Sequence, residues 1–221
     1  MPDPYQRVAV FDLDGTLVRG DSFARFLRLL LLRRPIRAVI SLLSAIILVP
    51  LFLISRTRRR AVAGFLWLAT IGVPPHRFEA LAEEFALAHA AEPRRIAITL
   101  DRLRSHQRAG DRVIIVTGCA DPLAGAVCRA LGLAGVEVIA ARLEHSRRAH
   151  RVAEGCLGAD KVRRLEQAGV VPPIEYAYSD SAVDLPLLRA AKHPVLVGPS
   201  PRTRQRVRAA LGTDPAVLPL D

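Results

Sequence analysis

The amino-acid sequence predicts an α/β fold, namely a Rossmann-like, doubly wound parallel sheet with an inserted helical cap. Short apolar runs alternate with helix-like segments along most of the 221 residues, which is the pattern of a parallel sheet covered by helices on both faces. Between residues 18 and 91 the alternation stops, and leucine-rich helical segments follow one another. We therefore expect a catalytic core formed by residues 1–17 and 92–221 and a cap formed by residues 18–91.

Five short apolar runs are expected to form the strands of the core. Each is rich in Val, Ile or Ala and is bounded by polar residues, Gly or Pro, as is typical of buried parallel strands. They lie at residues 7–13, 112–117, 136–140, 174–179 and 194–197. The expected helices of the core lie at residues 122–131, 160–168, 184–190 and 201–211. Residues 142–155 are basic and lack apolar periodicity, which predicts a surface flap or hairpin.

Two aspartates directly follow the first expected strand, in the sequence Asp12-Leu-Asp14-Gly-Thr16. Side chains two residues apart in an extended chain project to the same side, so Asp12 and Asp14 should lie together at the carboxyl end of the sheet. Open α/β sheets bind their ligands at that edge. Two carboxylates this close repel each other unless a cation joins them. Mg²⁺ fits, because it takes oxygen ligands and needs few of them from the protein.

Further polar residues stand at the ends of later strands and helices. Thr117 and Gly118 end the second strand, where a hydroxyl and a backbone N–H can hold phosphoryl oxygens. Lys161, near the start of an expected helix, offers a compact ammonium to a phosphate. Asp180 can complete the metal site, and Asp184 can hold Asp180, a metal-bound water or Lys161 in place. Each residue alone has a helix-cap or turn role as its alternative, but the ordered set favours one site.

This ordered set resembles the haloacid dehalogenase-like phosphohydrolase superfamily, and within it the helical-cap subfamily. The resemblance implies that Asp12 is a nucleophile that forms an aspartyl-phosphate intermediate. It implies that Asp14 protonates the leaving group and later activates water. It further implies Mg²⁺ as the cofactor, held by Asp12, the main-chain carbonyl of Asp14, and Asp180.

The same resemblance assigns roles to the remaining residues. Thr117 and Gly118 would bind the phosphate of the substrate, and Lys161 would act both in catalysis and in phosphate binding. Asp184 and Thr16 would support the site. Phosphoserine phosphatases of this superfamily carry a glutamate soon after the first motif, whereas Asp21 is the acid nearest to that place here. This departure argues against an amino-acid phosphate as the substrate.

An uncharged apolar run of 17 residues, residues 38–54, lies within the expected cap and is flanked by arginines. At about 1.5 Å per residue it reaches about 25 Å, the short limit for a membrane span. A single crossing would separate Asp12 from Lys161 and Asp180, which are expected to meet. We therefore predict a membrane-associating in-plane helix or a re-entrant hairpin with residues 61–73 as its second arm; the alternative is a buried helix. The flanking arginines favour the cytoplasmic side.

The apolar run, with Phe65-Leu-Trp-Leu and Tyr178-Ser-Asp-Ser, resembles the phosphatidylglycerophosphatase C family of bacteria. That resemblance implies dephosphorylation of phosphatidylglycerophosphate, an anionic phospholipid partner and a membrane surface. It also implies a location at the bacterial cytoplasmic membrane, with the catalytic core on the cytoplasmic side. One alternative is a soluble, cytoplasmic small-molecule phosphatase or phosphotransferase that acts on a small phosphomonoester. The other is a catalytically idle membrane-bound scaffold of the same fold.

Composition limits the other possibilities. Lys and Arg total 32 against 21 Asp and Glu, and the net charge of +11 favours anionic partners. No nucleic-acid-binding motif is present and aromatic residues make up only 5% of the chain, so nucleic acid is not expected as a partner. The three cysteines are too scattered for a disulfide framework or a zinc site. The six histidines show no ligand spacing and are expected at surface or packing positions.

Overall fold

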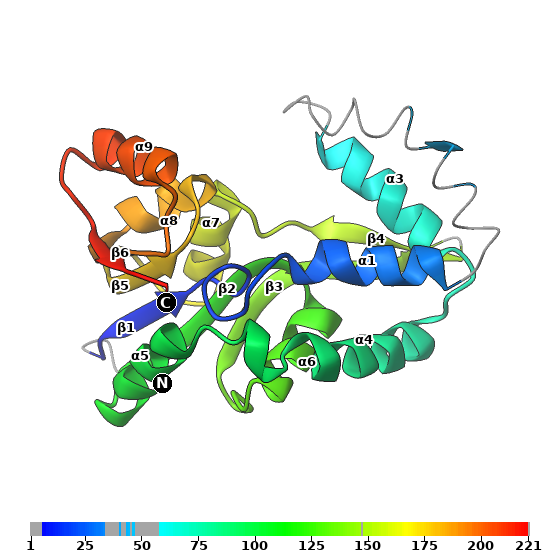
Figure 1. The fold of residues 1–221 in the computed structure, drawn as a ribbon, viewed down its shortest axis with the longest axis horizontal. Coiled ribbons are helices and arrows are strands. Elements are labelled where there is room, and N and C mark those ends of the chain that lie inside the picture. Colours follow the sequence, from blue (N-terminus) through cyan, green and yellow to red (C-terminus); the bar gives the residue numbers. More distant parts are fainter. Residues whose placement is uncertain are drawn as a thin grey trace.

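A seven-stranded sheet forms the centre of the computed structural model, which describes residues 6–33, 40, 43, 44, 46, 58–146 and 148–220. The strand order is β4-β3-β2-β1-β5-β6-β7, and only the β3–β4 pair is antiparallel. The predicted Rossmann-like α/β fold is therefore confirmed (Figure 1). The strands are β1 Val8–Phe11, β2 Arg112–Ala120, β3 Glu137–Ser146, β4 Ala149–Glu154, β5 Ile174–Ser179, β6 Ala191–Val197 and β7 Ala216–Leu218.

Helices cover both faces of the sheet (Figure 1). They are α1 Ser22–Leu32, α3 Arg58–Thr70, α4 Pro75–His89, α5 Ala97–Arg108, α6 Asp121–Ala130, α7 Ala159–Gln167, α8 Leu185–Arg189 and α9 Pro201–Leu211, with short 3₁₀ turns at Glu92–Arg94 and Ala182–Asp184. Because side chains alternate along a strand, Phe11 packs in the core on the side of α5 and α6, while Val10 packs on the side of α7 to α9. The site therefore stands on a sheet that is buried on both faces.

The inserted helices leave and rejoin the core at neighbouring points. Val18 forms an isolated bridge with Arg95, and the backbone N–H of Arg19 donates to the carbonyl of Arg94 at 2.7 Å. Figure 1 places α1, α3 and α4 at one end of the molecule, with the β3–β4 hairpin beside α3. The division of the chain at residues 18 and 91 stays a prediction.

The predicted flap at residues 142–155 belongs to the β3–β4 hairpin, which holds the inserted helices against the core. The Oγ1 atom of Thr70 accepts a hydrogen bond from the backbone N–H of His150 at 2.9 Å. Beyond α3, the N–H of Gly72 donates to the carbonyl of Arg148 at 2.6 Å. The His150 ring also stacks on Phe78 of α4, with the ring centroids 4.5 Å apart. The hairpin therefore touches two of the inserted helices.

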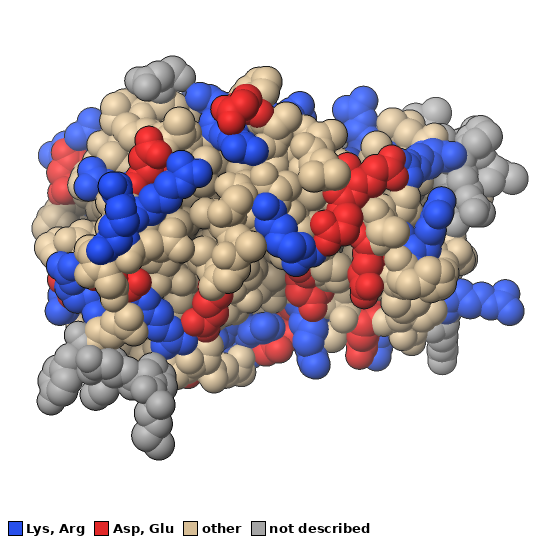
Figure 2. Space-filling model, turned by 90° about the horizontal axis from the view of Figure 1, so that it is seen from below, with Lys and Arg blue, Asp and Glu red and all other residues tan. Residues whose placement is uncertain are grey.

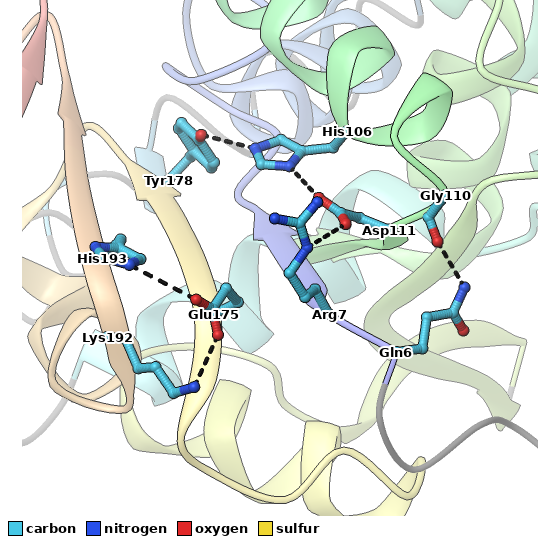
Figure 3. A network of polar contacts seen from close by, with 9 residues as sticks. All are labelled: Gln6, Arg7, His106, Gly110, Asp111, Glu175, Tyr178, Lys192 and His193. Atoms are coloured by element: carbon cyan, nitrogen blue, oxygen red, sulfur yellow. Dashed lines mark hydrogen bonds and ion pairs between the residues drawn. The ribbon is translucent and has the colours of Figure 1, made fainter.

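A polar network ties the amino end of the sheet to the end of α5 (Figure 3). Asp111, just before β2, lies 2.9 Å from Nε of Arg7 and 2.7 Å from Nδ1 of His106. The other ring nitrogen of His106 lies 2.8 Å from the hydroxyl of Tyr178, whose ring stacks on Phe11. These contacts fix β1, β2 and β5 relative to one another. Arg7 and Asp111 lie at the amino ends of β1 and β2, whereas Tyr178 lies near the carboxyl end of β5, where the site stands.

Charges of both signs are interspersed on the face formed by α4, α5 and α6, which Figure 2 shows from below. Arg129 of α6 contacts Glu83 of α4, and Arg104 lies 3.3 Å from Asp101 on α5. On this face the net positive charge of the chain is not gathered into one basic patch.

The expected location at the bacterial cytoplasmic membrane, with the core on its cytoplasmic side, is wrong. That expectation depended on residues 38–54, of which the structure describes only positions 40, 43, 44 and 46. A helix needs about 20 apolar residues to cross a bilayer, and the longest of the described helices, α4, has 15 residues. Within the described part of the chain, no helix combines the length and the apolar character that a span requires. An uncharged run in a sequence shows an apolar composition and does not determine the length of a helix.

Candidate active site

The loop after β1 brings two carboxylates to the carboxyl end of the sheet. The backbone N–H of Asp12 still continues the ladder to β5 by donating to the carbonyl of Tyr178 at 2.9 Å. The chain then turns tightly, because the N–H of Gly15 donates to the carbonyl of Val18 at 2.8 Å and Gly15 has a φ of +79°. The turn therefore begins directly after β1, and Asp12 and Asp14 lie within it at the carboxyl end of the sheet.

Lys161, the third residue of α7, joins the loop after β1 to the turn after β5. Its Nζ lies 2.7 Å from Oδ1 of Asp12 and 2.7 Å from Oδ2 of Asp184. The hydroxyl of Ser179 donates to the same Asp184 oxygen at 2.7 Å. The side chain of Lys161 is only 2% exposed, so the site contains a buried cation between two buried carboxylates.

Asp180 lies against the loop that carries Asp12 and Asp14. A Cβ atom placed on Gly15 would come within 2.2 Å of Oδ2 of Asp180. The carboxylate of Asp180 therefore lies against the backbone of Gly15, the residue that follows Asp14. Only glycine, which lacks a Cβ, permits this approach.

Burial dominates the electrostatics of the acids. It raises the pKa of Asp12 to about 8, with Lys161 opposing the rise and Asp184 adding to it. Burial also raises the pKa of Asp14 to about 7, against the hydrogen bond from Ser22, and that of Asp180 to about 6. Burial disfavours the charge on Lys161, but the attraction of Asp12 and Asp184 outweighs it and raises the lysine pKa. Burial thus disfavours the ionised form of all three acids, and the charge of Lys161 offsets this only in part.

Thr117 and Gly118, the predicted phosphate-binding residues, are located by their position in the chain rather than by a contact with Lys161. Thr117 lies two residues beyond Ile115, the partner of Phe11 in the sheet, so it reaches the same edge as Asp12. Its hydroxyl accepts a hydrogen bond from the N–H of Cys119 at 3.1 Å. Gly118 lies beside the Leu157 side chain. Within the described residues, no hydrogen bond joins these two residues to Lys161.

Thr16 supports the loop through its backbone alone. Its N–H donates to the carbonyl of Leu13 at 3.3 Å. Its hydroxyl is buried and has no hydrogen-bond partner among the described residues. Within the described residues, the support that Thr16 gives the loop therefore comes from this backbone hydrogen bond.

Sequence reasoning missed two residues behind Asp14. Both the N–H and the hydroxyl of Ser22 donate to Oδ1 of Asp14. The ring of His89, at the end of α4, lies 3.0 Å from the Ser22 hydroxyl. The sequence Asp21-Ser22 signals the start of a helix, but nothing in it shows where the serine side chain points. His89 carries no local signal at all.

The oxygen atoms that the protein offers at this edge of the sheet are suitable ligands for a hard divalent cation. No group of three His, Cys, Asp or Glu side chains in the described part of the chain is arranged to hold a metal. The expected set, however, needs only Asp12 and Asp180 as side-chain ligands, with the carbonyl of Asp14. All three ligands supply oxygen, which Mg²⁺ prefers. Burial has raised the pKa of both side chains, and a bound cation would favour their ionised forms.

Comparison with known proteins places this edge in context. The model of the haloacid dehalogenase-like hydrolase family matches residues 9–189. A probable phosphatase of Mycobacterium tuberculosis strain H37Rv is 31% identical over 103 residues, an alignment that covers 45% of this chain and 36% of the relative. The match thus spans only about a third of that relative's length.

Solved structures share the fold. A protein of unknown function from Bordetella pertussis Tohama I is 27% identical with a TM-score of 0.73, and the match covers 98% of this chain and 99% of the other. A substrate-bound phosphoserine phosphatase has a TM-score of 0.59 at 16% identity, with 99% and 96% covered. Cytosolic 5′-nucleotidase IIIB bound to cytidine has a TM-score of 0.63 at 13% identity, with 96% and 79% covered. The last two likenesses concern the fold alone.

Proposed function

Because the chain belongs to the haloacid dehalogenase-like hydrolase family, we propose that it is a phosphomonoester hydrolase that works through an aspartyl phosphate on Asp12. The observation that carries this proposal is the position of Lys161, 2.7 Å from both Asp12 and Asp184. A buried ammonium at the end of β1 holds the expected nucleophile in place and offsets the charge of an arriving phosphate. Asp180 also contacts this loop, because its carboxylate lies against Gly15, the residue after Asp14.

The proposed reaction has two steps on phosphorus. In the first, Oδ2 of Asp12 attacks, because Oδ1 is bound to Lys161; the bond to the leaving oxygen breaks, and Asp14 gives that oxygen its proton. In the second, water attacks the phosphorus and gives a proton to Asp14. The bond to Asp12 then breaks and releases phosphate. A pKa of about 7 suits Asp14 to both roles.

Other groups would bind the phosphoryl oxygens rather than react. We assign this role to Lys161 and to the hydroxyl and backbone N–H groups at Thr117 and Gly118. Mg²⁺, bound by Asp12, the carbonyl of Asp14, and Asp180, would neutralise charge on the phosphoryl group. Asp184 would hold Lys161 in position.

The substrate proposed is a small phosphomonoester. This choice corresponds to the soluble-phosphatase alternative, and two proteins with the same fold, the phosphoserine phosphatase and the 5′-nucleotidase, are named for such substrates. Asp21 accepts a hydrogen bond from the N–H of Ala24 at 2.8 Å, so one of its oxygens is used to cap α1. Phosphatidylglycerophosphate, the anionic phospholipid implied by the sequence resemblance, becomes the competing substrate of the test.

The test measures phosphate release by the full chain with Mg²⁺. The panel contains 4-nitrophenyl phosphate, phosphoserine, a nucleoside 5′-monophosphate, and phosphatidylglycerophosphate in detergent micelles. Release from at least one of the small esters is the expected result. Release from the phospholipid alone would refute the small-substrate proposal, and no release from any ester would refute hydrolysis and favour a catalytically idle protein.

Mg²⁺ is expected to raise the melting temperature more at pH 8 than at pH 5. The folded pKa of Asp12, about 8, lies above its ordinary value of 3.8, so its ionisation costs stability as pH rises through that range. A cation would offset this cost at pH 8, whereas protons compete with it at pH 5. At about 100 times Kd the gain is about 2.7 kcal/mol, or roughly 5–10 °C for a chain of this size.

Scanning fluorimetry measures this shift, with NaCl of equal ionic strength as the control. The Asp180→Asn variant should lose most of the gain, because it removes one proposed ligand. A melting temperature that does not respond to Mg²⁺ at pH 8 would contradict the metal site.

The Gly15→Ala variant is expected to lose activity, and Gly110→Ala is its matched control. Both glycines have a φ of +79°, so both variants should lose about 1–2 kcal/mol of stability. Only at Gly15 would the new methyl group collide with Asp180, whereas nothing lies within 4 Å at Gly110. Displacement of Asp180 should therefore lower kcat roughly tenfold or more in Gly15→Ala alone. Equal activities of the two variants would show that Asp180 need not stay where it lies.

A further inference from the structure

A chain of hydrogen-bonded side chains lies behind Asp14 and connects it to the inserted helices. The N–H of Ser22 donates to Oδ1 of Asp14 at 3.1 Å, and the Ser22 hydroxyl donates to the same oxygen. Nε2 of His89 lies 3.0 Å from that hydroxyl. Ser22 is fully buried and His89 is 4% exposed. Three separate elements, the β1 loop, the start of α1 and the end of α4, thus meet at one carboxyl oxygen.

The hydrogen count fixes the direction of these bonds. Burial, together with the charges of Arg94 and Arg25, lowers the pKa of His89 to about 4, so the ring is neutral at pH 7 and carries one N–H. Ser22 has a single hydroxyl hydrogen, and Asp14 takes it. The hydroxyl oxygen must then accept from the ring, which places the hydrogen of His89 on Nε2.

We propose that His89 is a positioning residue for Asp14, acting through Ser22. It holds the serine hydroxyl against Oδ1, so that Oδ2 is left as the oxygen that carries the reacting proton. Oδ1 accepts from Ser22 whether or not Oδ2 is protonated, so the arrangement serves both proposed steps without a change of partners. This inference deepens the proposed function and rests on it.

The ring of His89 is itself held by packing. It stacks on Phe85, one turn earlier on α4, with the ring centroids 4.9 Å apart and the planes at 18°. An unanchored imidazole would not keep Nε2 aimed at Ser22. The helix α4 therefore supplies both the donor and the surface that orients it, and a residue of the inserted segment reaches the proposed general acid through one intermediate side chain.

Two substitutions separate positioning from simple packing. His89→Phe keeps a flat ring against Phe85 but removes the donor. His89→Gln loses the ring but offers an amide N–H near the place of Nε2. A packing role predicts that Phe is the milder change, whereas a positioning role predicts that Gln is.

The leaving group of the substrate provides the readout. A general acid matters for an alkyl phosphomonoester, whose alkoxide leaves poorly, and little for 4-nitrophenyl phosphate, whose phenolate leaves without a proton. The ratio kcat/KM reports the steps up to the departure of that group. In His89→Phe we expect it to fall about five- to tenfold for the alkyl ester and less than about twofold for the aryl ester. His89→Gln should recover most of the loss.

Ser22→Ala provides a second measurement, and as a single variant it does not depend on the folding of the histidine variants. It should reproduce the same selective loss, and adding His89→Phe to it should cause no further loss, because His89 acts only through the hydroxyl. Equal losses on both esters, additive losses in the double variant, or a milder effect of Phe than of Gln would overturn the inference while leaving the hydrolase proposal intact. A wild-type protein that hydrolyses neither ester would instead refute the proposed function, and this inference with it.

Discussion

The Asp12→Asn variant is expected to lose phosphatase activity by at least on the order of 10⁴-fold. The amide has nearly the shape of the carboxylate but is a far weaker nucleophile, so no aspartyl phosphate can form. The fold should tolerate the change. Asp12 is buried and its pKa is raised to about 8, which means that its charge costs stability at neutral pH. Lys161 keeps its second partner, Asp184, at 2.7 Å.

Two measurements check this expectation. Urea unfolding should give a free energy within about 1 kcal/mol of the wild type, since removing the charge of Asp12 also removes its desolvation cost. Acid quenching during turnover of a ³²P-labelled ester should leave label on the wild-type protein, in a bond that hydroxylamine cleaves, and none on the variant. Asp101→Asn, at a side chain that is 72% exposed, is the matched control. Label retained by Asp12→Asn would place the nucleophile elsewhere.

The strands and helices of the core could be predicted because each carries a local signal. The apolar run before Asp12 and the run that ends at Thr117 both appear in the structure as parallel strands. β7 was missed, because Ala216–Leu218 is only three residues long and stands between Pro215 and Pro219. Its pairing with β6 is a long-range contact with no local pattern to reveal it.

The candidate site divides in the same way. Asp12 and Asp180 directly follow β1 and β5, Asp184 lies in the turn just beyond Asp180, and the carboxyl ends of parallel strands meet at one edge. Their closeness therefore follows from the order of the elements. Ser22 and His89 are 67 residues apart and meet only because α1 packs beside α4. That packing depends on tertiary structure within the inserted segment. The sequence of this segment shows helical periodicity but does not show which helices contact each other.

The membrane interpretation failed for a related reason. An uncharged run of residues is compatible with a span, a surface helix or a buried helix, and composition does not choose between them. The expected meeting of Asp12 and Lys161 is seen in the structure, since the two side chains are hydrogen-bonded. It constrained the topology of the chain but carried no information about a bilayer.

The Lys161→Met variant is expected to lose both activity and about 3–5 kcal/mol of stability. Methionine fills a similar volume but leaves Asp12 and Asp184 buried, with side chains 10% and 4% exposed and no cation between them. The chain has only one other lysine, Lys192, which provides the control. It is 53% exposed and lies 2.9 Å from Glu175 at the other end of the sheet (Figure 3), so Lys192→Met should cost at most about 1 kcal/mol.

The dependence on pH and on metal gives this prediction its sharpest form. Without Lys161 the pKa of Asp12 should rise above about 8, so the carboxyl stays protonated at pH 5. The free-energy cost of ionising this buried group then appears only as the pH rises. Urea unfolding should therefore show a larger loss relative to the wild type at pH 8 than at pH 5. Mg²⁺ should recover part of the loss at pH 8, because it would supply another cation to Asp12. A loss of stability that is the same at both pH values and unaffected by Mg²⁺ would mean that Lys161 stabilises the protein by packing alone. That result would contradict the proposed role of its charge at the end of β1.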